Sequence, residues 1–244
     1  MFRTTPARLT ITGALLLLAA MPAVAEAERY RRSFPWSGYR WQVRLATGED
    51  PGHNDWGDSA RNVRVRPDGT LRLAIVRDGS KRRSVELATV RRLGYGRYRW
   101  VVGSKLGRLD HFSVLALFTN DTVHRAPYGE QDFEFTHWGN AGAPPGWAVS
   151  WSQRVKAFDG FSLSNLAPYT IDITWRLSVV RFHMRDGGGV VLYDVTRPML
   201  SNGRFMAARM SYWLFPGFPR ELLPPPVIVR DFEFTPLSRL PSPR

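Results

Sequence analysis

Cysteine is absent from this chain of 244 residues, which excludes every disulfide and every lipid-modified cysteine. Long apolar runs are scarce as well. The run over residues 15–20 is shorter than the ~20 apolar residues that a membrane-spanning helix needs, and no other stretch is long enough. The composition fits a protein that folds without covalent cross-links.

Motifs for nucleotide and zinc chemistry are also missing. Gly94-x-Gly96 lacks the third glycine of a dinucleotide-binding loop, and no phosphate-loop sequence occurs. The five histidines show no zinc-ligand spacing, and no Gly-x-Ser-x-Gly elbow is present. We therefore expect neither a cofactor nor a catalytic metal.

The first 25 residues have the order of a secretory signal peptide. Arg3 and Arg8 give a basic start, residues 15–20 an apolar core, and Ala23 and Ala25 the small-residue pair before cleavage. This order predicts cleavage after Ala25. The mature protein is then periplasmic or secreted, with no membrane attachment after the signal is removed.

The chain is strongly basic, with 34 Lys and Arg against 21 Asp and Glu, a net charge of +13. Such a charge favours polyanionic partners, among them an acidic exopolysaccharide. The arginines are spread along the chain, however, and over residues 61–66 they alternate with apolar residues as on the solvated face of a strand. We expect no nucleic-acid partner.

Short alternating segments follow one another along the mature chain, and none shows a convincing helical period. They predict an all-β, antiparallel β-sandwich in a single domain over residues 26–236, followed by a frayed tail over 237–244. We expect a monomer. The predicted strands are 39–45, 62–66, 70–76, 84–90, 96–102, 111–119, the acidic segment 130–135, 147–153, 169–175, 178–184, 190–195, 204–215 and 227–234.

Turn residues and tryptophans add local detail to this prediction. Residues 67–69 (Pro-Asp-Gly) and 186–189 (Asp-Gly-Gly-Gly) predict two hairpins, and residues 47–59 predict a long loop. Trp41, Trp100 and Trp175 are expected in the core because they lie on the apolar side of alternating strands.

Three carboxylates alternate along residues 130–134. In a strand, Glu130, Asp132 and Glu134 point to one face, and Phe133 and Phe135 to the other. Like charges at this spacing repel and are costly to bury, so strand stability does not explain them. Hydrolysis of an acetal needs one protonated and one ionised carboxyl group, and repulsion from Asp132 raises the proton affinity of its neighbours.

Two other uses of the acids are open from the residues alone. A calcium site is one, although calcium prefers acids on a loop with backbone carbonyls beside them. Pairing with the many arginines of this chain is the other. Spacing by itself does not decide between these uses and catalysis.

The acidic strand does not stand alone. Asp-Gly-Thr-Leu-Arg-Leu over 68–73 and Gly-Tyr-Gly-Arg-Tyr over 94–98 precede Glu-Gln-Asp-Phe-Glu-Phe over 130–135, and Val-Arg-Asp-Phe-Glu-Phe over 229–234 follows. In this order the segments resemble glycoside hydrolase family 16, the laminarinase, lichenase and xyloglucan-transferase group. The resemblance covers nearly the whole mature chain.

The resemblance implies a concanavalin A-like jelly roll with a glycan cleft across a concave sheet. It also implies that Glu130 is the nucleophile, Glu134 the acid/base and Asp132 an assisting acid. The signature lacks the extra residue that gives some branches a bulge, which implies a regular strand. Tyr128 stands where members often have tryptophan, and Gln131 replaces the usual aliphatic residue.

Aromatic rings commonly hold sugars because the axial hydrogens of a pyranose pack on their faces. We expect Trp56, Tyr128 and Trp138 to contact substrate, with His137 bonding a sugar or a catalytic carboxylate. Trp147 and Trp151 also surround the acidic strand in the sequence.

The resulting hypothesis is an exported retaining glycosidase that cleaves or transfers β-linked polysaccharide. The alternative is a lectin-like or structural sandwich that binds a glycan, acidic or neutral, without turnover. The intact acid trio favours the enzyme. The sequence does not specify the sugar or the linkage.

Overall fold

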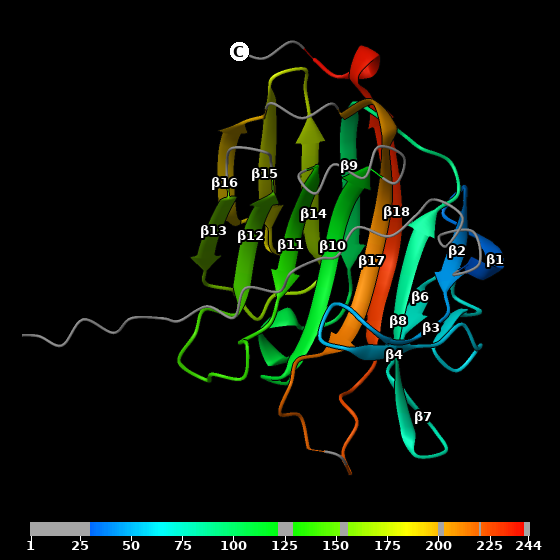
Figure 1. The fold of residues 1–244 in the computed structure, drawn as a ribbon. Coiled ribbons are helices and arrows are strands. Elements are labelled where there is room, and N and C mark those ends of the chain that lie inside the picture. Colours follow the sequence, from blue (N-terminus) through cyan, green and yellow to red (C-terminus); the bar gives the residue numbers. More distant parts are fainter. Residues whose placement is uncertain (1–29, 122–128, 152–155, 200–202, 220, 242–244) are drawn as a thin grey trace, which may run out of the picture.

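The computed structural model describes residues 30–121, 129–151, 156–199, 203–219 and 221–241. The expected signal peptide, the remaining residues up to 29 and Tyr128 lie outside this part of the chain. The described residues form two stacked β-sheets, and three short 3-10 turns are their only helical segments. Figure 1 shows the first sheet in front of the second. The predicted all-β, antiparallel sandwich is confirmed.

The first sheet has eleven strands and follows the order β1-β2-β8-β17-β10-β11-β12-β13, with β3, β4 and β7 joined at its side. Its strands are β1 (Tyr30–Trp36), β2 (Tyr39–Arg44), β3 (Ala46–Glu49), β4 (Asn54–Trp56), β7 (Val76–Asp78), β8 (Lys81–Thr89), β10 (Ser113–Asp121), β11 (Glu130–Phe135), β12 (Gly146–Trp151), β13 (Lys156–Phe161) and β17 (Met206–Leu214).

The second sheet has seven strands in the order β16-β15-β14-β9-β18-β6-β5. Its strands are β5 (Val63–Val65), β6 (Leu71–Leu73), β9 (Gly96–Val102), β14 (Tyr169–Trp175), β15 (Val179–Arg185), β16 (Val191–Pro198) and β18 (Val227–Pro236). Neighbouring strands in both sheets run antiparallel, except that β4 runs parallel to β8. Because neighbours are often distant in sequence, the sheets depend on long-range pairing.

The core lies between the sheets and is rich in aromatic rings. Trp41, Trp100 and Trp175 are completely buried, as the alternation predicts. The indole N–H of Trp175 in the second sheet donates to Thr119 Oγ1 in the first over 2.8 Å, which satisfies a polar atom inside the core. Trp41 packs edge-on against Phe232 with ring centroids 5.1 Å apart. These contacts join the two sheets.

Both predicted hairpins form. The first joins β5 to β6 through Gly69, whose φ of 80° is a conformation that glycine adopts without strain. The second joins β15 to β16, where the Asp186 carboxylate accepts the N–H groups of Gly188 and Val190. In each case the turn residues form local contacts that the sequence predicts, and at the second turn Ser164 and Leu166 add bonds to Asp186 and Gly187.

The structure differs from the prediction at the chain ends and in one loop. The predicted loop over 47–59 contains β3 and β4, and strands β1 and β13 are additional. Residues Leu237–Arg239, expected to fray, form a 3-10 turn, and the N–H of Leu237 donates to the carbonyl of Tyr95 over 3.0 Å. Strands β1, β3 and β13 each pair with a strand close in the sequence, namely β2, β4 and β12, whereas the C-terminal turn is held by the distant Tyr95.

Candidate active site

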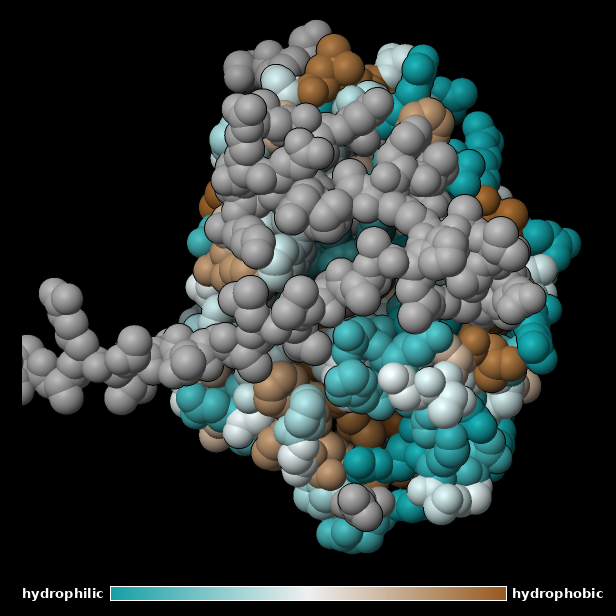
Figure 2. Space-filling view, viewed as in Figure 1, coloured by the Kyte–Doolittle hydropathy of each residue, from teal (hydrophilic) through white to brown (hydrophobic). Residues whose placement is uncertain are grey.

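The three acids lie in the middle of the first sheet on β11. Phe133 and Phe135 are completely buried in the core between the sheets, so Glu130, Asp132 and Glu134 share the face that is turned away from the second sheet. We call this the outer face. It faces the viewer in Figure 1, and in Figure 2 its visible part carries mainly hydrophilic residues with apolar ones between them.

Strand β12 places an apolar side chain opposite each acid. Trp151 lies opposite Glu130, Val149 opposite Asp132, and Trp147 opposite Glu134. The indole N–H of Trp147 donates to the carbonyls of residues 136 and 144, which fixes the ring beside Glu134. One flank of the acid row is therefore apolar along its whole length.

Strand β10 gives the acids three different neighbours on the other flank. Asn120 Nδ2 donates to Glu130 Oε2 over 2.6 Å, whereas Asp132 lies opposite Phe118 and Glu134 opposite Ala116. Asp132 is thus enclosed by Phe118 and Val149 and is only 3% exposed. Glu134 stands beside the smallest of these side chains and is half-buried. The three carboxyl groups consequently experience different environments.

Burial raises the pKa of Asp132 well above its usual value, and the charges of Glu130 and Glu134 raise it further. Asp132 therefore holds its proton more tightly than an exposed aspartic acid does. Its carboxyl group donates a hydrogen bond to Glu130, which lowers the pKa of Glu130. Asp132 thus acts as a neutral donor between two other acids.

Burial raises the pKa of both Glu134 and Glu130, but only Glu130 has neighbours that oppose this rise. Burial and then the charge of Glu130 raise the pKa of Glu134 to about 8, so Glu134 is protonated at neutral pH. Burial also raises the pKa of Glu130, but the charge of Arg209, the amide of Asn120 and the proton of Asp132 oppose this effect. Glu130 is therefore the member of the trio that ionises most readily.

Arg209 belongs to a charged network next to the trio. It lies on β17, opposite Phe118, and its guanidinium Cζ lies 6.0 Å from the centre of that ring. Its Nη1 donates to Glu86 Oε1 over 3.2 Å, and Glu86 also accepts bonds from Arg44 and Tyr30. Burial alone would raise the pKa of Glu86, but Arg44 and Arg209 lower it below its ordinary value. Glu86 thus holds Arg209 in place as an anion.

The ion pairs and side-chain clusters of the described residues bear on the two alternative uses of the acids. Among the described residues no arginine lies within ion-pair distance of Glu130, Asp132 or Glu134. The same residues contain no group of three or more His, Asp or Glu side chains that could hold a metal ion. The acids face apolar neighbours, one amide and one another.

Trp56 is a correction to the predicted sugar contacts. Its side chain is completely buried, with the guanidinium of Arg44 4.5 Å from its ring centre and its N–H donated to the carbonyl of Glu49. The predicted loop folds into β3 and β4 and encloses the ring. Trp56 therefore presents no face to a ligand.

The other predicted contacts have mixed positions. Trp138 is partly buried and packs against Trp213 and Phe215, with ring centroids 6.3 and 5.5 Å away. His137 Nδ1 lies 2.9 Å from the carbonyl oxygen of Ala143, so this nitrogen holds the local loop. Within the described residues, the hydrogen bonds of His137 and Trp138 go to the carbonyl of Ala143 and the hydroxyl of Thr136 and not to an acid, so both stay predictions as sugar contacts. Tyr128 lies outside the described residues.

The sequence did not predict the neighbours that give the three acids different environments, namely Asn120, Phe118, Ala116 and Arg209. They come from β10 and β17, and only the register of those strands with β11 brings them to the site. Residues 114–118 are all apolar, so their pattern does not distinguish Ala116 and Phe118, which face the acids, from the side chains that face the core.

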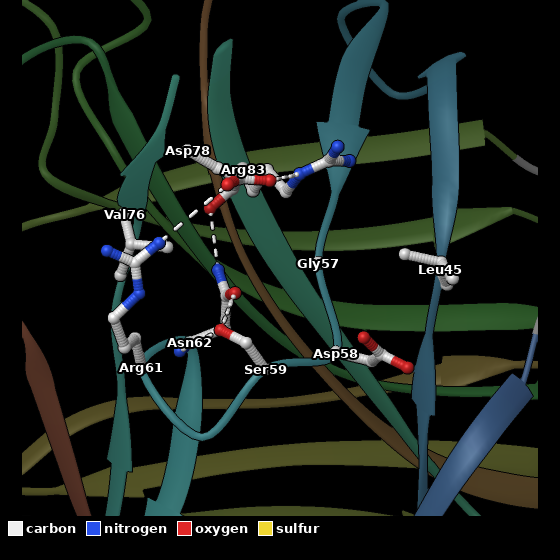
Figure 3. A pocket seen from close by; sticks show the side chains of 9 residues that line it. All are labelled: Leu45, Gly57, Asp58, Ser59, Arg61, Asn62, Val76, Asp78 and Arg83. Atoms are coloured by element: carbon white, nitrogen blue, oxygen red, sulfur yellow. Dashed lines mark hydrogen bonds and ion pairs between the residues drawn. The ribbon is translucent and has the colours of Figure 1, made fainter. Parts of the chain in front are cut away.

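A separate hollow of about 180 Å³ lies near β4 and β7 and is lined by none of the acids (Figure 3). Asp78 is paired there with Arg83 at 2.6 Å and Arg61 at 3.9 Å. Asn62 donates to the carbonyls of residues 74 and 83 and accepts the hydroxyl of Ser59. Its polar groups satisfy one another, so the outer-face row is the better candidate for chemistry.

No protein-family model matches the chain, and no curated protein matches it either. Several solved structures, in contrast, are similar to this chain. A glycosyl hydrolase family 16 protein from Mycobacterium smegmatis shares 17% identity and a TM-score of 0.58, over 79% of this chain and 90% of that one. The Bacillus licheniformis β-glucanase shares 17% identity and a TM-score of 0.60, over 83% and 97%.

A third similar structure is described as a pseudo β-1,3-glucanase of Mycobacterium tuberculosis, with 17% identity and a TM-score of 0.56 over 78% of this chain and 90% of that one. At these identities the likeness concerns the fold. The chain has the jelly-roll sandwich fold of glycoside hydrolase family 16, as its motifs predict. The described residues include no helix with the length and apolarity required for a membrane span.

Proposed function

We propose that this protein is an exported retaining glycosidase that cleaves β-linked polysaccharide at the three acids of β11. The fold of family 16 is the premise. The observation that carries the proposal is the different proton affinity of acids on one strand: Glu134 has a pKa of about 8, while Glu130 receives two hydrogen bonds and the field of Arg209. Acetal hydrolysis requires one protonated and one ionised carboxyl group.

In the first step the Glu130 carboxylate attacks the anomeric carbon of the bound sugar. The bond between that carbon and the bridging oxygen breaks, and Glu134 gives its proton to the leaving oxygen. The products are a glycosyl ester on Glu130 and a shortened chain with a free hydroxyl group. Glu134 is now ionised, and it lies beside a neutral ester instead of a charged Glu130 carboxylate, so the repulsion between the two groups is small.

In the second step Glu134 acts as the base. It takes a proton from water, whose oxygen attacks the anomeric carbon and releases Glu130 as a carboxylate. Two displacements at the same carbon retain its configuration. A sugar hydroxyl in place of water would give transfer by the same route, so the mechanism covers hydrolysis and transglycosylation.

Asp132 is assigned a positioning role in this scheme. As a neutral acid it donates to Glu130 and so holds the nucleophile in one rotamer. Its enclosure by Phe118 and Val149 keeps the proton in place because an ionised carboxylate there would lose its hydration.

Export is part of the proposal because a polysaccharide cannot enter the cell to meet its enzyme. The signal-like residues 1–25 support a periplasmic or secreted location, and a monomer acting on polysaccharide is expected. The sugars to be tested first are β-1,3- and mixed-linkage β-glucans, since solved proteins of similar fold are described as glucanases.

The proposal is tested by reducing-sugar release from β-1,3-glucan, mixed-linkage β-glucan, xyloglucan, galactan and acidic exopolysaccharide. Glu130→Gln and Glu134→Gln should each lower the rate by about 10²–10⁴-fold or more. Glu233→Gln is the matched control, because Glu233 is an exposed acid on β18 of the other sheet. Equal cleavage by wild type and Glu130→Gln contradicts the proposed mechanism.

The alternative function is glycan binding without turnover. The description of a similar structure as a pseudo-glucanase concerns that protein, but it marks this alternative as the one to test. Tight binding of a glycan that is never cleaved would favour the alternative over the enzyme.

A further inference from the structure

Two aromatic rings lie next to each other on the outer face beyond the acids. Phe158 on β13 is 49% exposed, an unusually open position for a phenylalanine. The Trp151 and Phe158 rings meet edge to face, with centroids 5.1 Å apart and planes at 87°. We call this pair the aromatic platform.

Strand register connects the platform to the acid row. Trp151 lies opposite Glu130, and Phe158 lies opposite Val149, which in turn lies opposite Asp132. All these side chains share the outer face, because Ala148 and Phe161, which have the other parity on β12 and β13, are buried in the core. The platform therefore begins beside the nucleophile and extends to the edge of the sheet (Figure 1).

Packing does not require a ring at position 158. On the inner side of the same strand Phe161 already packs against Phe133, with centroids 5.9 Å apart. The edge strand β13 does carry charge, since Asp159 is paired with Arg197 at 2.6 Å, yet the ring of Phe158 beside it lies exposed on the outer face. Exposed aromatic faces next to a row of acids suit the apolar face of a pyranose ring.

We propose that Trp151 and Phe158 form a sugar subsite for a β-linked glucan chain that runs from the acids across β12 to β13. The proposal rests on the proposed function and specifies where its substrate lies. Two strand spacings separate β11 from β13, about 10 Å, which is room for roughly two sugar rings. Longer oligosaccharides should therefore reach Phe158, and the shortest should not.

The test measures Kd for β-1,3- and mixed-linkage gluco-oligosaccharides of increasing length, using Glu134→Gln so that no ligand is consumed. Adding Phe158→Ala should weaken binding of the longer oligosaccharides about tenfold, an aromatic contact being worth ~0.5–1.5 kcal/mol beyond its area, and leave the disaccharides unchanged. Phe158→Trp should keep tight binding. Leu177→Ala, at a residue 74% exposed, is the control and should change nothing.

The outcomes distinguish failure of the subsite proposal from failure of the proposed glycosidase function. Length-dependent loss in Phe158→Ala with no cleavage by wild type supports the platform and refutes the hydrolase. Cleavage by wild type with unchanged Kd in Phe158→Ala overturns the platform and leaves the hydrolase. An equal loss for every length, or no binding of either series by the Glu134→Gln protein, also overturns the platform. Circular dichroism should be the same for all variants, because Phe158 is exposed.

Discussion

Asn120 and Glu130 are joined across β10 and β11 by a hydrogen bond of 2.6 Å, with the amide nitrogen as donor and the carboxylate oxygen as acceptor. On β10 the positions opposite Asp132 and Glu134 are occupied by Phe118 and Ala116, so this strand gives an amide only to Glu130. Together with the charge of Arg209 and the hydrogen bond from Asp132, this contact distinguishes the acid that should attack from the acid that should protonate.

Replacing Asn120 with alanine should reduce kcat/KM by about 10–100-fold, because a hydrogen bond to a charged group is worth roughly 1.5–3 kcal/mol. The acidic limb of the pH–rate profile should also move to higher pH, since the bond stabilises ionised Glu130. The profile is measured on the best polysaccharide of the screen. Asn140→Ala, at an exposed asparagine, is the control. An unchanged acidic limb would contradict the assigned role of the amide.

Arg209 should act on the same carboxylate through its charge. Arg209→Met should raise the pKa of Glu130 and lower activity severalfold on the acidic limb of the pH–rate profile while changing it less at the optimum. Arg209→Lys keeps the charge and should restore most of the loss. The acidic limb, determined from kcat/KM against pH, checks this result. A loss that is the same at every pH would instead indicate a merely structural role beside Glu86.

Activity should fall as pH rises through about 8, because Glu134 must be protonated to release the leaving group and its pKa is about 8. The basic limb of kcat/KM is the measurement. Substrates with an activated aryl leaving group need no proton, so for them the fall in the first step should disappear. A basic limb that is the same for both substrate types would argue against Glu134 as the acid.

Stability should respond to the same ionisation. The folded pKa of Glu134 lies above the ordinary 4.5, so folded protein holds this proton more tightly than unfolded protein. Its contribution to the free energy of unfolding is complete below pH 4.5 and is lost as pH rises to about 8. Glu134→Gln should remove this loss, making the variant more stable than wild type by about 1–3 kcal/mol at pH 8 and not at pH 4. Urea unfolding at both pH values checks the difference.

Asp132 offers a test of a neutral acid. Asp132→Asn keeps a donor of the same shape and should fold at least as stably as wild type, with a modest loss of kcat. Asp132→Ala leaves Glu130 without that donor and should lose considerably more kcat. Thermal unfolding and kcat together check the order. If the asparagine variant were the more damaged, Asp132 would have to act as an anion.

The sequence predicts the acid row because the cause is local. Alternation along one strand places Glu130, Asp132 and Glu134 on one face whatever the strand pairs with, and Phe133 and Phe135 make the other face the core. The same reasoning applies to Trp100, whose neighbours on β9 alternate between buried and half-buried. Hairpins with glycine turns are local too.

The surroundings of the acids could not be predicted because they depend on strand order. β10 pairs with β17, almost 100 residues later in the chain, and this pairing brings Arg209 to Phe118. The burial of Trp56 could not be predicted either, because it also depends on strand pairing. A loop rich in turn residues resembled a ligand-binding loop, yet its pairing with β8 buries the indole beneath Arg44.

The most direct test of the central claim is the identity of the residue that becomes glycosylated. A 2-deoxy-2-fluoro glycoside of the sugar that the screen identifies slows the second displacement, so the ester accumulates and can be located by peptide mass spectrometry. The account predicts one added sugar, on Glu130, and none in Glu130→Gln. A label on another residue, or cleavage of the polysaccharide with inverted configuration at the anomeric carbon, would contradict it.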